Sequence, residues 1–189
     1  PFDVIIDFSH PSVFDSILEF SVKTKTPAVI CTTGLSGEQI SKMKAASKKA
    51  PIFFSANMSL GVNLLIDLVC KAAKLLDGSF HIEIIEKHRN QKLEAPSGTA
   101  LAIADAISDA VSFDTEYIYD RHNVRKKRDK SEIGIHAVRG GTIVGEHDVI
   151  FAGNDEIIEI KHSASSKEVF AVGAVKAAVF MKGKPCGMY

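Results

Sequence analysis

The sequence predicts an α/β fold followed by an α+β fold: a partial, doubly wound parallel sheet, and then a mostly antiparallel open sheet with helices on one face. Two observations lead to this division. Over the first 58 residues, short β-branched runs alternate with amphipathic helical patterns, the order that builds parallel sheets with right-handed crossovers. Beyond about residue 110, strand patterns follow one another with little helix between them, which is typical of hairpin-linked neighbours.

The first module is expected to contain short buried strands joined by helices. Each strand is an apolar, β-branched run of the kind found in parallel sheets, and these runs cover residues 3–8, 28–31 and 52–55. Ser9-His10-Pro11 supplies a helix start with proline in the first turn. Ser36, with Gln39 three residues later, forms a capping box that should begin a second helix, which runs to about Lys49.

The second module should begin with a buried helix over residues 60–76, which is apolar on most faces. A second helix is expected from its N-cap Ser97 to about Ala110. Gly140-Gly141 and Gly153-Asn154-Asp155 have the turn chemistry that joins neighbouring strands. The expected strands are 81–86, 116–119, 133–139, 142–144, 149–152 and 157–162. We therefore predict two domains, residues 1–58 together with a C-terminal helix at about 165–189, and residues 59–164.

Composition excludes several classes of partner. Lys plus Arg and Asp plus Glu both number 23, so the zero net charge gives no sign of binding to nucleic acid or to an anionic membrane. The basic run Arg125-Lys126-Lys127-Arg128 has no interleaved aromatic residues, which favours a solvated loop, although it could also lie near cofactor phosphates or a neighbouring subunit. No apolar stretch reaches the length of a membrane-spanning helix.

The cysteines and histidines give no metal signature. Cys31, Cys70 and Cys186 are far apart, odd in number and without C-x-x-C spacing, which argues against a disulfide framework or zinc knuckle and favours a cytoplasmic location. His136 and His162 could face one side of the second sheet and meet, but no carboxylate spacing accompanies them. We expect no metal site.

One segment, residues 86–100 (EKHRNQKLEAPSGTA), combines the groups that a small anion needs. A strand ends at His88, a polar loop carries Arg89 and Lys92, and Pro96-Ser97-Gly98-Thr99 begins a helix. Backbone N–H groups at a helix start, with hydroxyls and a glycine, form an anion pocket, and a histidine can transfer a proton near neutral pH. Each residue alone has an ordinary structural explanation, such as an N-cap for Ser97. The set together predicts a site that binds a small anion and transfers a proton.

The same segment resembles the dihydrodipicolinate reductase (4-hydroxy-tetrahydrodipicolinate reductase) family. The order of motifs along nearly the whole chain is similar to that family: VIIDFS at 4–9, TTGL at 32–35, SANMSLGVN at 55–63, APSGTA at 95–100, VRGGTIVGEH at 138–147 and ASS at 164–166. The resemblance implies a Rossmann-like cofactor domain, of which residues 1–58 and the last helix are the remainder, and a substrate-binding and oligomerisation domain over 59–164. It also implies a homotetramer joined through the second-domain sheets.

The resemblance implies a role for particular residues. NADH or NADPH would deliver a hydride to a cyclic, unsaturated dicarboxylate in lysine and diaminopimelate biosynthesis. His88 matches the catalytic histidine and Lys92 the proton-donating lysine, while Ser97, Gly98 and Thr99 match the grip on a substrate carboxylate. The loops matching those that line the nicotinamide and ribose consist of Cys31, Thr32, Thr33, Ser55, Ala56, Asn57 and Met58. Both loops follow predicted parallel strands, where ligands of open α/β sheets bind.

Three departures from the family pattern shape the alternatives. Arg89 stands where a second histidine is usual, so substrate binding is expected there and proton transfer is not. Cys31 replaces a usual glycine, and it would either crowd the cofactor or fill a buried position. The chain starts within what should be a later strand of the cofactor domain, so no glycine-rich turn for the cofactor pyrophosphate is present. We therefore expect an exposed apolar edge on the first sheet and weak NADH binding by these residues alone.

Three functions remain open from the sequence. The leading one is a nicotinamide-dependent reductase of a pyridine-type dicarboxylate. The second is a truncated module that keeps the dicarboxylate pocket and the assembly sheet but lacks turnover. The third is a related oxidoreductase whose Arg89 marks a different small acid as substrate.

Overall fold

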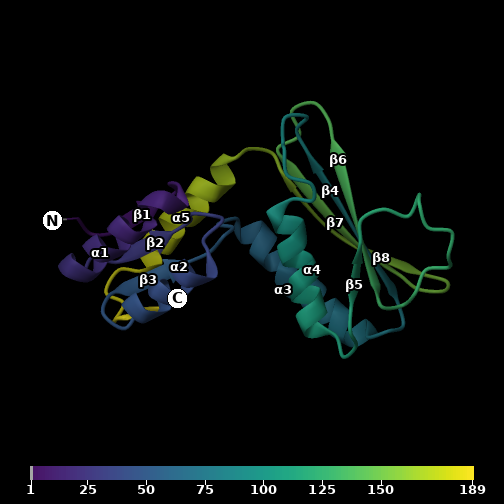
Figure 1. Ribbon diagram of the computed structural model, residues 1–189, viewed down its shortest axis with the longest axis horizontal. Helices are drawn as coiled ribbons and strands as arrows, with labels where there is room; N and C mark the ends of the chain where they lie inside the picture. Colours follow the sequence, from purple (N-terminus) through teal and green to yellow (C-terminus); the bar gives the residue numbers. More distant parts are fainter. Residues whose placement is uncertain (1) are drawn as a thin grey trace. The chain divides into compact units, whose positions relative to one another are not determined.

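The computed structural model describes residues 2–189, and these form two compact units. Unit 1 consists of the residues up to Leu60 together with Glu168–Tyr189, and unit 2 is Gly61–Lys167. The last helix therefore packs with the first part of the chain although the whole of unit 2 separates them in sequence (Figure 1). Within the described residues no helix is long and apolar enough to cross a membrane.

Unit 1 is a four-stranded parallel sheet with the order β1-β2-β3-β9. Its strands are β1 (Ile5–Asp7), β2 (Ala28–Ile30), β3 (Pro51–Phe54) and β9 (Gly187–Met188). Its helices are the 3-10 turn η1 (Pro11–Val13), α1 (Phe14–Thr24), α2 (Gly37–Ala46) and α5 (Glu168–Phe180). The predicted capping box is confirmed, because Ser36 accepts from the Gln39 N–H while the Gln39 side chain accepts from the Ser36 N–H. Strand β9 was not expected from the sequence.

Alternation along β2 divides the core of unit 1 into two layers. Ala28 and Ile30 face α1 and α2, where Phe14 and Met43 are fully buried. Val29 and Cys31 face the other way and pack against Met58 and α5. Helices thus cover both faces of a parallel sheet, which is the doubly wound arrangement predicted from the sequence.

Exposed apolar side chains lie near the edge strand β1 of this sheet. Strand β1 is the terminal strand in the sheet order, and Phe2, Ile6 and Phe8 near it are 74%, 40% and 53% exposed. A hollow of about 1160 Å³ lies beside this edge, lined largely by apolar residues such as Phe20 and Val175. This hollow contains none of the predicted site residues.

Unit 2 is a five-stranded sheet with two helices on one face (Figure 1). Its helices are α3 (Leu60–Leu76) and α4 (Gly98–Ala110), and its strands are β4 (His81–His88), β5 (Glu116–Ile118), β6 (Glu132–Arg139), β7 (Gly145–Ala152) and β8 (Ile157–Ala164). Side chains from both helices pack on the same sheet residues, including Ile84, Ile135 and Phe151. We call this helix-covered side the inner face of the sheet, and the opposite side the outer face.

The sheet of unit 2 is mixed rather than mostly antiparallel. Its order is β5-β6-β4-β7-β8; the pairs β5–β6 and β6–β4 are parallel, and the pairs β4–β7 and β7–β8 are antiparallel. Gly140-Gly141 was expected to join paired neighbours, but it connects β6 to β7 and strand β4 lies between them. The expected strand at 142–144 is wrong, since these residues belong to that connection. Gly153-Asn154-Asp155 does form the β7–β8 hairpin turn.

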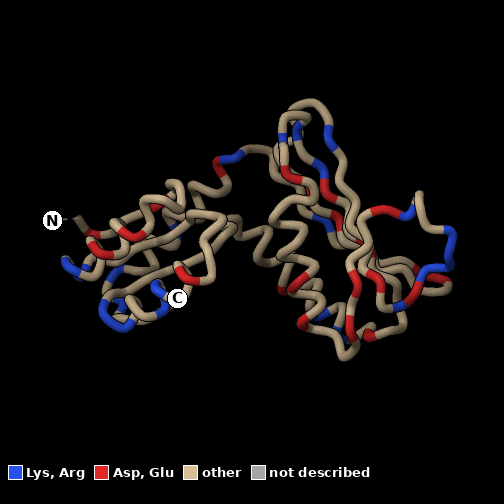
Figure 2. The backbone as a smooth tube through the Cα atoms, in the orientation of Figure 1, with Lys and Arg blue, Asp and Glu red and all other residues tan. Residues whose placement is uncertain are grey.

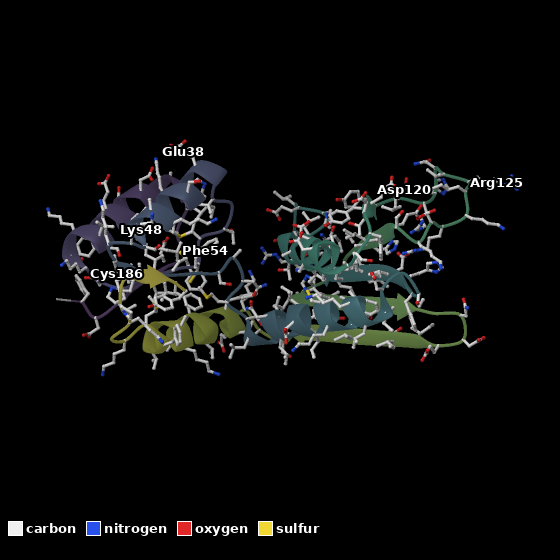
Figure 3. All side chains as sticks on the ribbon, turned by 90° about the horizontal axis from the view of Figure 1, so that it is seen from below. Glu38, Lys48, Phe54, Asp120, Arg125 and Cys186 are labelled. Atoms are coloured by element: carbon white, nitrogen blue, oxygen red, sulfur yellow. The ribbon has the colours of Figure 1, made fainter. Side chains whose placement is uncertain are left out.

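Charged residues lie along the long loop between β5 and β6 (Figure 2), and charged side chains form ion pairs on the outer face of the sheet. Glu83 on β4 pairs with Arg121, Arg128 and His136, while the buried Glu132 pairs with Arg121 and Lys126. Arg125 extends from the tip of that loop (Figure 3). The basic run is therefore only partly the solvated loop that the sequence favours, because Lys126 and Arg128 fold back onto carboxylates of the sheet.

Candidate active site

Strand β4 delivers Glu86 and His88 to the inner face. Ile82 and Ile84 are buried in the core beneath the helices, and strand side chains alternate between the two faces, so Glu86 and His88 continue the same row. Lys87, between them, points to the outer face and donates to Glu146 of β7 at 3.2 Å. The inner-face side chains of β4 thus change from apolar to ionisable at the end of the strand.

The Glu86 carboxylate is completely buried and accepts hydrogen bonds from three parts of unit 2. The Arg139 guanidinium on β6 binds both of its oxygens, at 2.6 and 2.8 Å. The backbone N–H of Ser97, just before α4, donates to it at 3.0 Å, and Nδ1 of His88 lies 2.6 Å away. Glu86 therefore ties two strand ends to the start of a helix.

These partners keep Glu86 ionised. Burial by itself would raise its pKa, but the hydrogen bonds from Arg139, His88 and the Ser97 N–H outweigh burial, and the net shift of the pKa is downward. An ionised carboxylate can only accept hydrogen bonds, so Nδ1 of His88 must carry the hydrogen that joins the pair. The other ring nitrogen, Nε2, makes no hydrogen bond within residues 2–189.

Helix α4 begins beside this pair. Ser97 is its N-cap: the backbone is extended there, and the Ser97 hydroxyl accepts from the Ala100 N–H at 3.1 Å. The first turn carries no acidic residue, and Gly98 is exposed with nothing within 4 Å of where a Cβ would be. Although Glu86 already accepts from the Ser97 N–H, a helix start with open space above a glycine is suited to an anion.

His147 on β7 completes the inner side of the cluster. Its Nε2 lies 3.1 Å from the Ser97 hydroxyl, and its ring meets the His88 ring edge-on, with 5.3 Å between centroids. Burial, followed by the neighbouring His88, lowers the pKa of His147 to about 4. His147 is therefore uncharged at neutral pH, and it supports Ser97 without adding positive charge.

The loop after β4 carries the two predicted cations. Lys92 is partly buried, with 24% of its side chain exposed, and it pairs with the exposed Glu94 at 3.2 Å. The Arg89 side chain is exposed and forms no hydrogen bond or ion pair with any residue from 2 to 189. Arg139 on β6 also donates to the backbone carbonyl of Glu94 at 2.7 Å, and this hydrogen bond holds the loop against the strand end.

In unit 1, the predicted cofactor loops follow β2 and β3 at the carboxyl edge of the parallel sheet. Asp7, at the end of β1, accepts from the Thr32 hydroxyl at 2.7 Å and holds the first loop. Thr33 and Ala56 are exposed at the tips of the two loops. The second loop is held by its own bonds, with Ser55 donating to the Asn57 carbonyl at 2.7 Å.

Cys31 fills a buried position. The residue is 5% exposed, packs with Val29 and Met58 in the core layer beneath α5, and has its thiol pKa raised to about 12 by burial and by Asp7. The thiol therefore stays protonated and unreactive, and the side chain points into the core rather than toward the loop surface. Met58 is likewise a core residue, whose carbonyl leaves space only for glycine at Gly173 on α5.

The structure brings His88, Ser97 and the start of α4 together, as the sequence suggests, and adds three residues that the sequence did not assign. Glu86 and Arg139 form an ion pair, and His147 contacts Ser97. The missed signal is the row Ile82, Ile84, Glu86, in which a carboxylate takes a core position of an alternating strand. His136 and His162 do not meet: His136 binds Glu83 on the outer face, whereas His162 is in register with His147.

Comparison with known proteins identifies the family. The model described as "Dihydrodipicolinate reductase, N-terminus" matches residues 1–58, and the one described as "Dihydrodipicolinate reductase, C-terminus" matches residues 61–189. The chain belongs to the dihydrodipicolinate reductase family. The C-terminal family model includes α5, although this helix packs in unit 1.

Curated relatives and a solved structure agree with this membership. The 4-hydroxy-tetrahydrodipicolinate reductases of Clostridium tetani and Caldanaerobacter subterraneus subsp. tengcongensis are each 57% identical over 99% of this chain, which covers 73% and 74% of their lengths. A dipicolinate-bound dihydrodipicolinate reductase from Paenisporosarcina sp. TG-14 superposes over 99% of this chain and 71% of that one, with a TM-score of 0.77 and 24% identity. That structure supports the fold, and the sequence relatives support the family.

Proposed function

We propose that this chain is an NAD(P)H-dependent reductase that converts 4-hydroxy-tetrahydrodipicolinate to tetrahydrodipicolinate in lysine and diaminopimelate biosynthesis. The change from the 4-hydroxy compound to tetrahydrodipicolinate would consume one hydride, which bound NAD(P)H would supply, and one proton, and it would release the ring hydroxyl as water. The observation that carries the proposal is the start of α4 beside the Glu86–His88 pair, within a chain 57% identical to reductases of that name.

The substrate side of the proposal rests on unit 2. We assign one ring carboxylate to the start of α4, where the Gly98 backbone and the Ser97 and Thr99 side chains surround an open, positively polarised helix end. Arg89 is exposed and unpaired within residues 2–189, and it would bind the second carboxylate. His88 and Lys92 are the catalytic residues of the proposal, with Lys92 as the proton donor.

The cofactor side rests on unit 1. NADH or NADPH supplies the hydride when bound, and the residues that would hold its nicotinamide and ribose are Cys31, Thr32, Thr33, Ser55, Ala56, Asn57 and Met58. Both loops lie at the carboxyl edge of a parallel sheet, and their exposed tips leave backbone groups accessible to a ligand. Cys31 and Met58 contribute backbone there, because their side chains belong to the core.

The wider organisation follows the same division. We assign unit 1 to cofactor binding and unit 2 to substrate binding and oligomerisation, and we propose a cytoplasmic homotetramer joined through the second sheet. In support, α3 and α4 cover only the inner face of that sheet, and the outer face carries paired charges together with the partly buried Ile85 and Ile150.

Turnover of 4-hydroxy-tetrahydrodipicolinate with NADH and with NADPH is the direct test. The intact protein should oxidise the cofactor only in the presence of the substrate, and Lys92→Ala should lower kcat by about 10²-fold or more while the KM for the cofactor stays similar. Tight binding of pyridine-2,6-dicarboxylate without any turnover would favour the alternative of a non-catalytic dicarboxylate-binding and assembly module, which no present observation supports.

Arg89→Ala tests the second carboxylate contact. Loss of a charge-assisted hydrogen bond of about 1.5–3 kcal/mol should raise the inhibition constant of pyridine-2,6-dicarboxylate by about 10- to 100-fold. The matched control is Arg125→Ala, an exposed arginine at the tip of the β5–β6 loop, which should leave the inhibition constant unchanged. An unchanged constant in Arg89→Ala would show that this residue does not contact the dicarboxylate.

A further inference from the structure

Glu86 has no assigned part in binding or turnover, yet its carboxylate is buried and accepts hydrogen bonds from three residues. Its side chain has no exposed surface, and its partners are Arg139, His88 and the Ser97 N–H. Two of those partners, His88 and Ser97, are residues that the proposed reaction uses. The third, Arg139, also holds the carbonyl of Glu94 in the loop that carries Lys92.

We propose that Glu86 is a positioning residue of the reductase site, whose ionised carboxylate fixes the tautomer and orientation of His88 while it holds the start of α4 beside the ring. This inference rests on the proposed function for its effect on catalysis. The effect of Glu86 on the tautomer and orientation of His88 does not depend on the proposed function, because it is a property of the unliganded protein.

The tautomer follows from the donor and acceptor count. Glu86 receives both Arg139 nitrogens, so its oxygens remain acceptors, and Nδ1 of His88 must donate to the carboxylate. In the neutral ring this leaves Nε2 as the unprotonated nitrogen, and this is the nitrogen without a protein partner within residues 2–189. A carboxylate that accepts from one ring nitrogen of a histidine thereby determines which nitrogen remains available to a ligand.

The fold by itself does not require a carboxylate at this position. Ile82 and Ile84 occupy the two preceding inner positions of β4, and a buried ion pair contributes no more stability than well-packed apolar residues of similar volume in many proteins. An apolar side chain at position 86 would continue the core row, but it could not accept from His88 or from the Ser97 N–H. The charge therefore points to a role in arranging the site.

Nitrogen-15 NMR of the histidine ring gives a readout that does not depend on turnover. We would label the full chain with ¹⁵N-histidine, identify the His88 signals by their loss in His88→Gln, and record long-range spectra at about pH 8.5, where an ordinary histidine is neutral. The wild-type protein should show His88 as the Nδ1–H tautomer. In Glu86→Gln, whose amide can donate to Nδ1, a large part of the population should change to the Nε2–H tautomer.

Kinetics of the same variant supply the second readout. Glu86→Gln should lower kcat at least tenfold and leave the KM for the cofactor within about twofold, because the cofactor loops belong to unit 1. The matched control is Glu83→Gln, which removes a charge bound to two arginines and a histidine on the outer face of the same strand. With its oligomeric state checked, this control should keep both the wild-type His88 tautomer and the wild-type kcat.

The outcomes separate this inference from the proposed function. An Nε2–H tautomer in the wild-type protein, or an unchanged tautomer in Glu86→Gln, would overturn the positioning role whatever the kinetics show. Absence of turnover by the wild-type chain, combined with the expected NMR change, would overturn the proposed function and leave the arrangement around His88 intact. The wild-type spectrum decides the tautomer even if Glu86→Gln does not fold.

Discussion

The two faces of strand β4 carry almost the same side chains in different surroundings. On the inner face, Glu86 binds one histidine and one arginine, and the carboxylate has no exposed surface. On the outer face, Glu83 binds one histidine and two arginines, but 21% of its side chain and 41% of that of His136 are exposed. Only the inner group lies against a helix start.

The difference shows that residue types alone do not define the site. Both carboxylates have pKa values below normal for the same reason, since the hydrogen bonds and charges of their partners outweigh the effect of burial. What separates them is the start of α4, where the Ser97 N–H donates to Glu86, whose side chain has no exposed surface.

Replacing the two carboxylate-bound histidines should have very different consequences for the rate. His88→Gln should lower kcat by about 10²- to 10⁴-fold, because it removes the group proposed to take part in proton transfer. His136→Gln, on the outer face, should keep kcat within about twofold of wild type. Steady-state kinetics of both variants is the measurement. A comparable loss of kcat in the two variants would mean that lying against the start of α4 does not make the inner histidine more important for catalysis than the outer one.

Removing each carboxylate should separate the faces in stability. Glu86→Ala should lower the free energy of unfolding by about 3–5 kcal/mol, because the Arg139 guanidinium, which is only 19% exposed, is left without its counter-charge. Glu83→Ala should cost less, about 1–2 kcal/mol, since Arg128 keeps three backbone carbonyls and Arg121 keeps Glu132. Urea unfolding at pH 7 would test this order, and equal losses would contradict it.

The inner face should also respond to acid through His147. Its folded pKa of about 4 lies below the ordinary 6.5, so below pH 6.5 the unfolded chain binds a proton that the folded chain does not. Stability should therefore fall between pH 6.5 and pH 4, by about 2 kcal/mol at pH 5 from this residue alone. The difference in unfolding free energy between pH 7 and pH 5 should shrink in His147→Gln and persist in His136→Gln. If the unfolding free energy of His147→Gln falls between pH 7 and pH 5 by as much as that of the wild type, His147 is not the source of the acid sensitivity.

The sequence predicted the helices and strands better than it predicted which strands pair with one another. Local signals such as the capping box at Ser36 and the N-cap at Ser97 depend on residues three or four apart, and the structure contains both. The position of β4 between β6 and β7 depends on contacts between segments about 50 to 70 residues apart, and no local pattern at Gly140-Gly141 distinguishes a turn to a neighbour from a connection across another strand.

The same reasoning explains which site residues were found. The segment 86–100 is continuous, so its histidine, cations and helix start could be identified together. Arg139 and His147 join the site only because β6 and β7 flank β4, which the predicted topology did not contain. Glu86 was visible as a carboxylate in an apolar row, but its meaning depends on Arg139 opposite it.

A glycine on each face supplies the finest comparison. A Cβ at Gly145 would lie 3.2 Å from Nε2 of His88, whereas a Cβ at Gly134 would lie 1.7 Å from a Glu83 oxygen. Gly145→Ala should displace the imidazole by a few tenths of an ångström and lower kcat about two- to tenfold, since a shift of about 1 Å costs up to about 10²-fold. Gly134→Ala should leave kcat unchanged but lower stability, because Glu83 must move away from Arg128 and His136. Kinetics and urea unfolding of both variants would test this, and a larger loss of rate in Gly134→Ala than in Gly145→Ala would show that catalysis depends on the outer cluster.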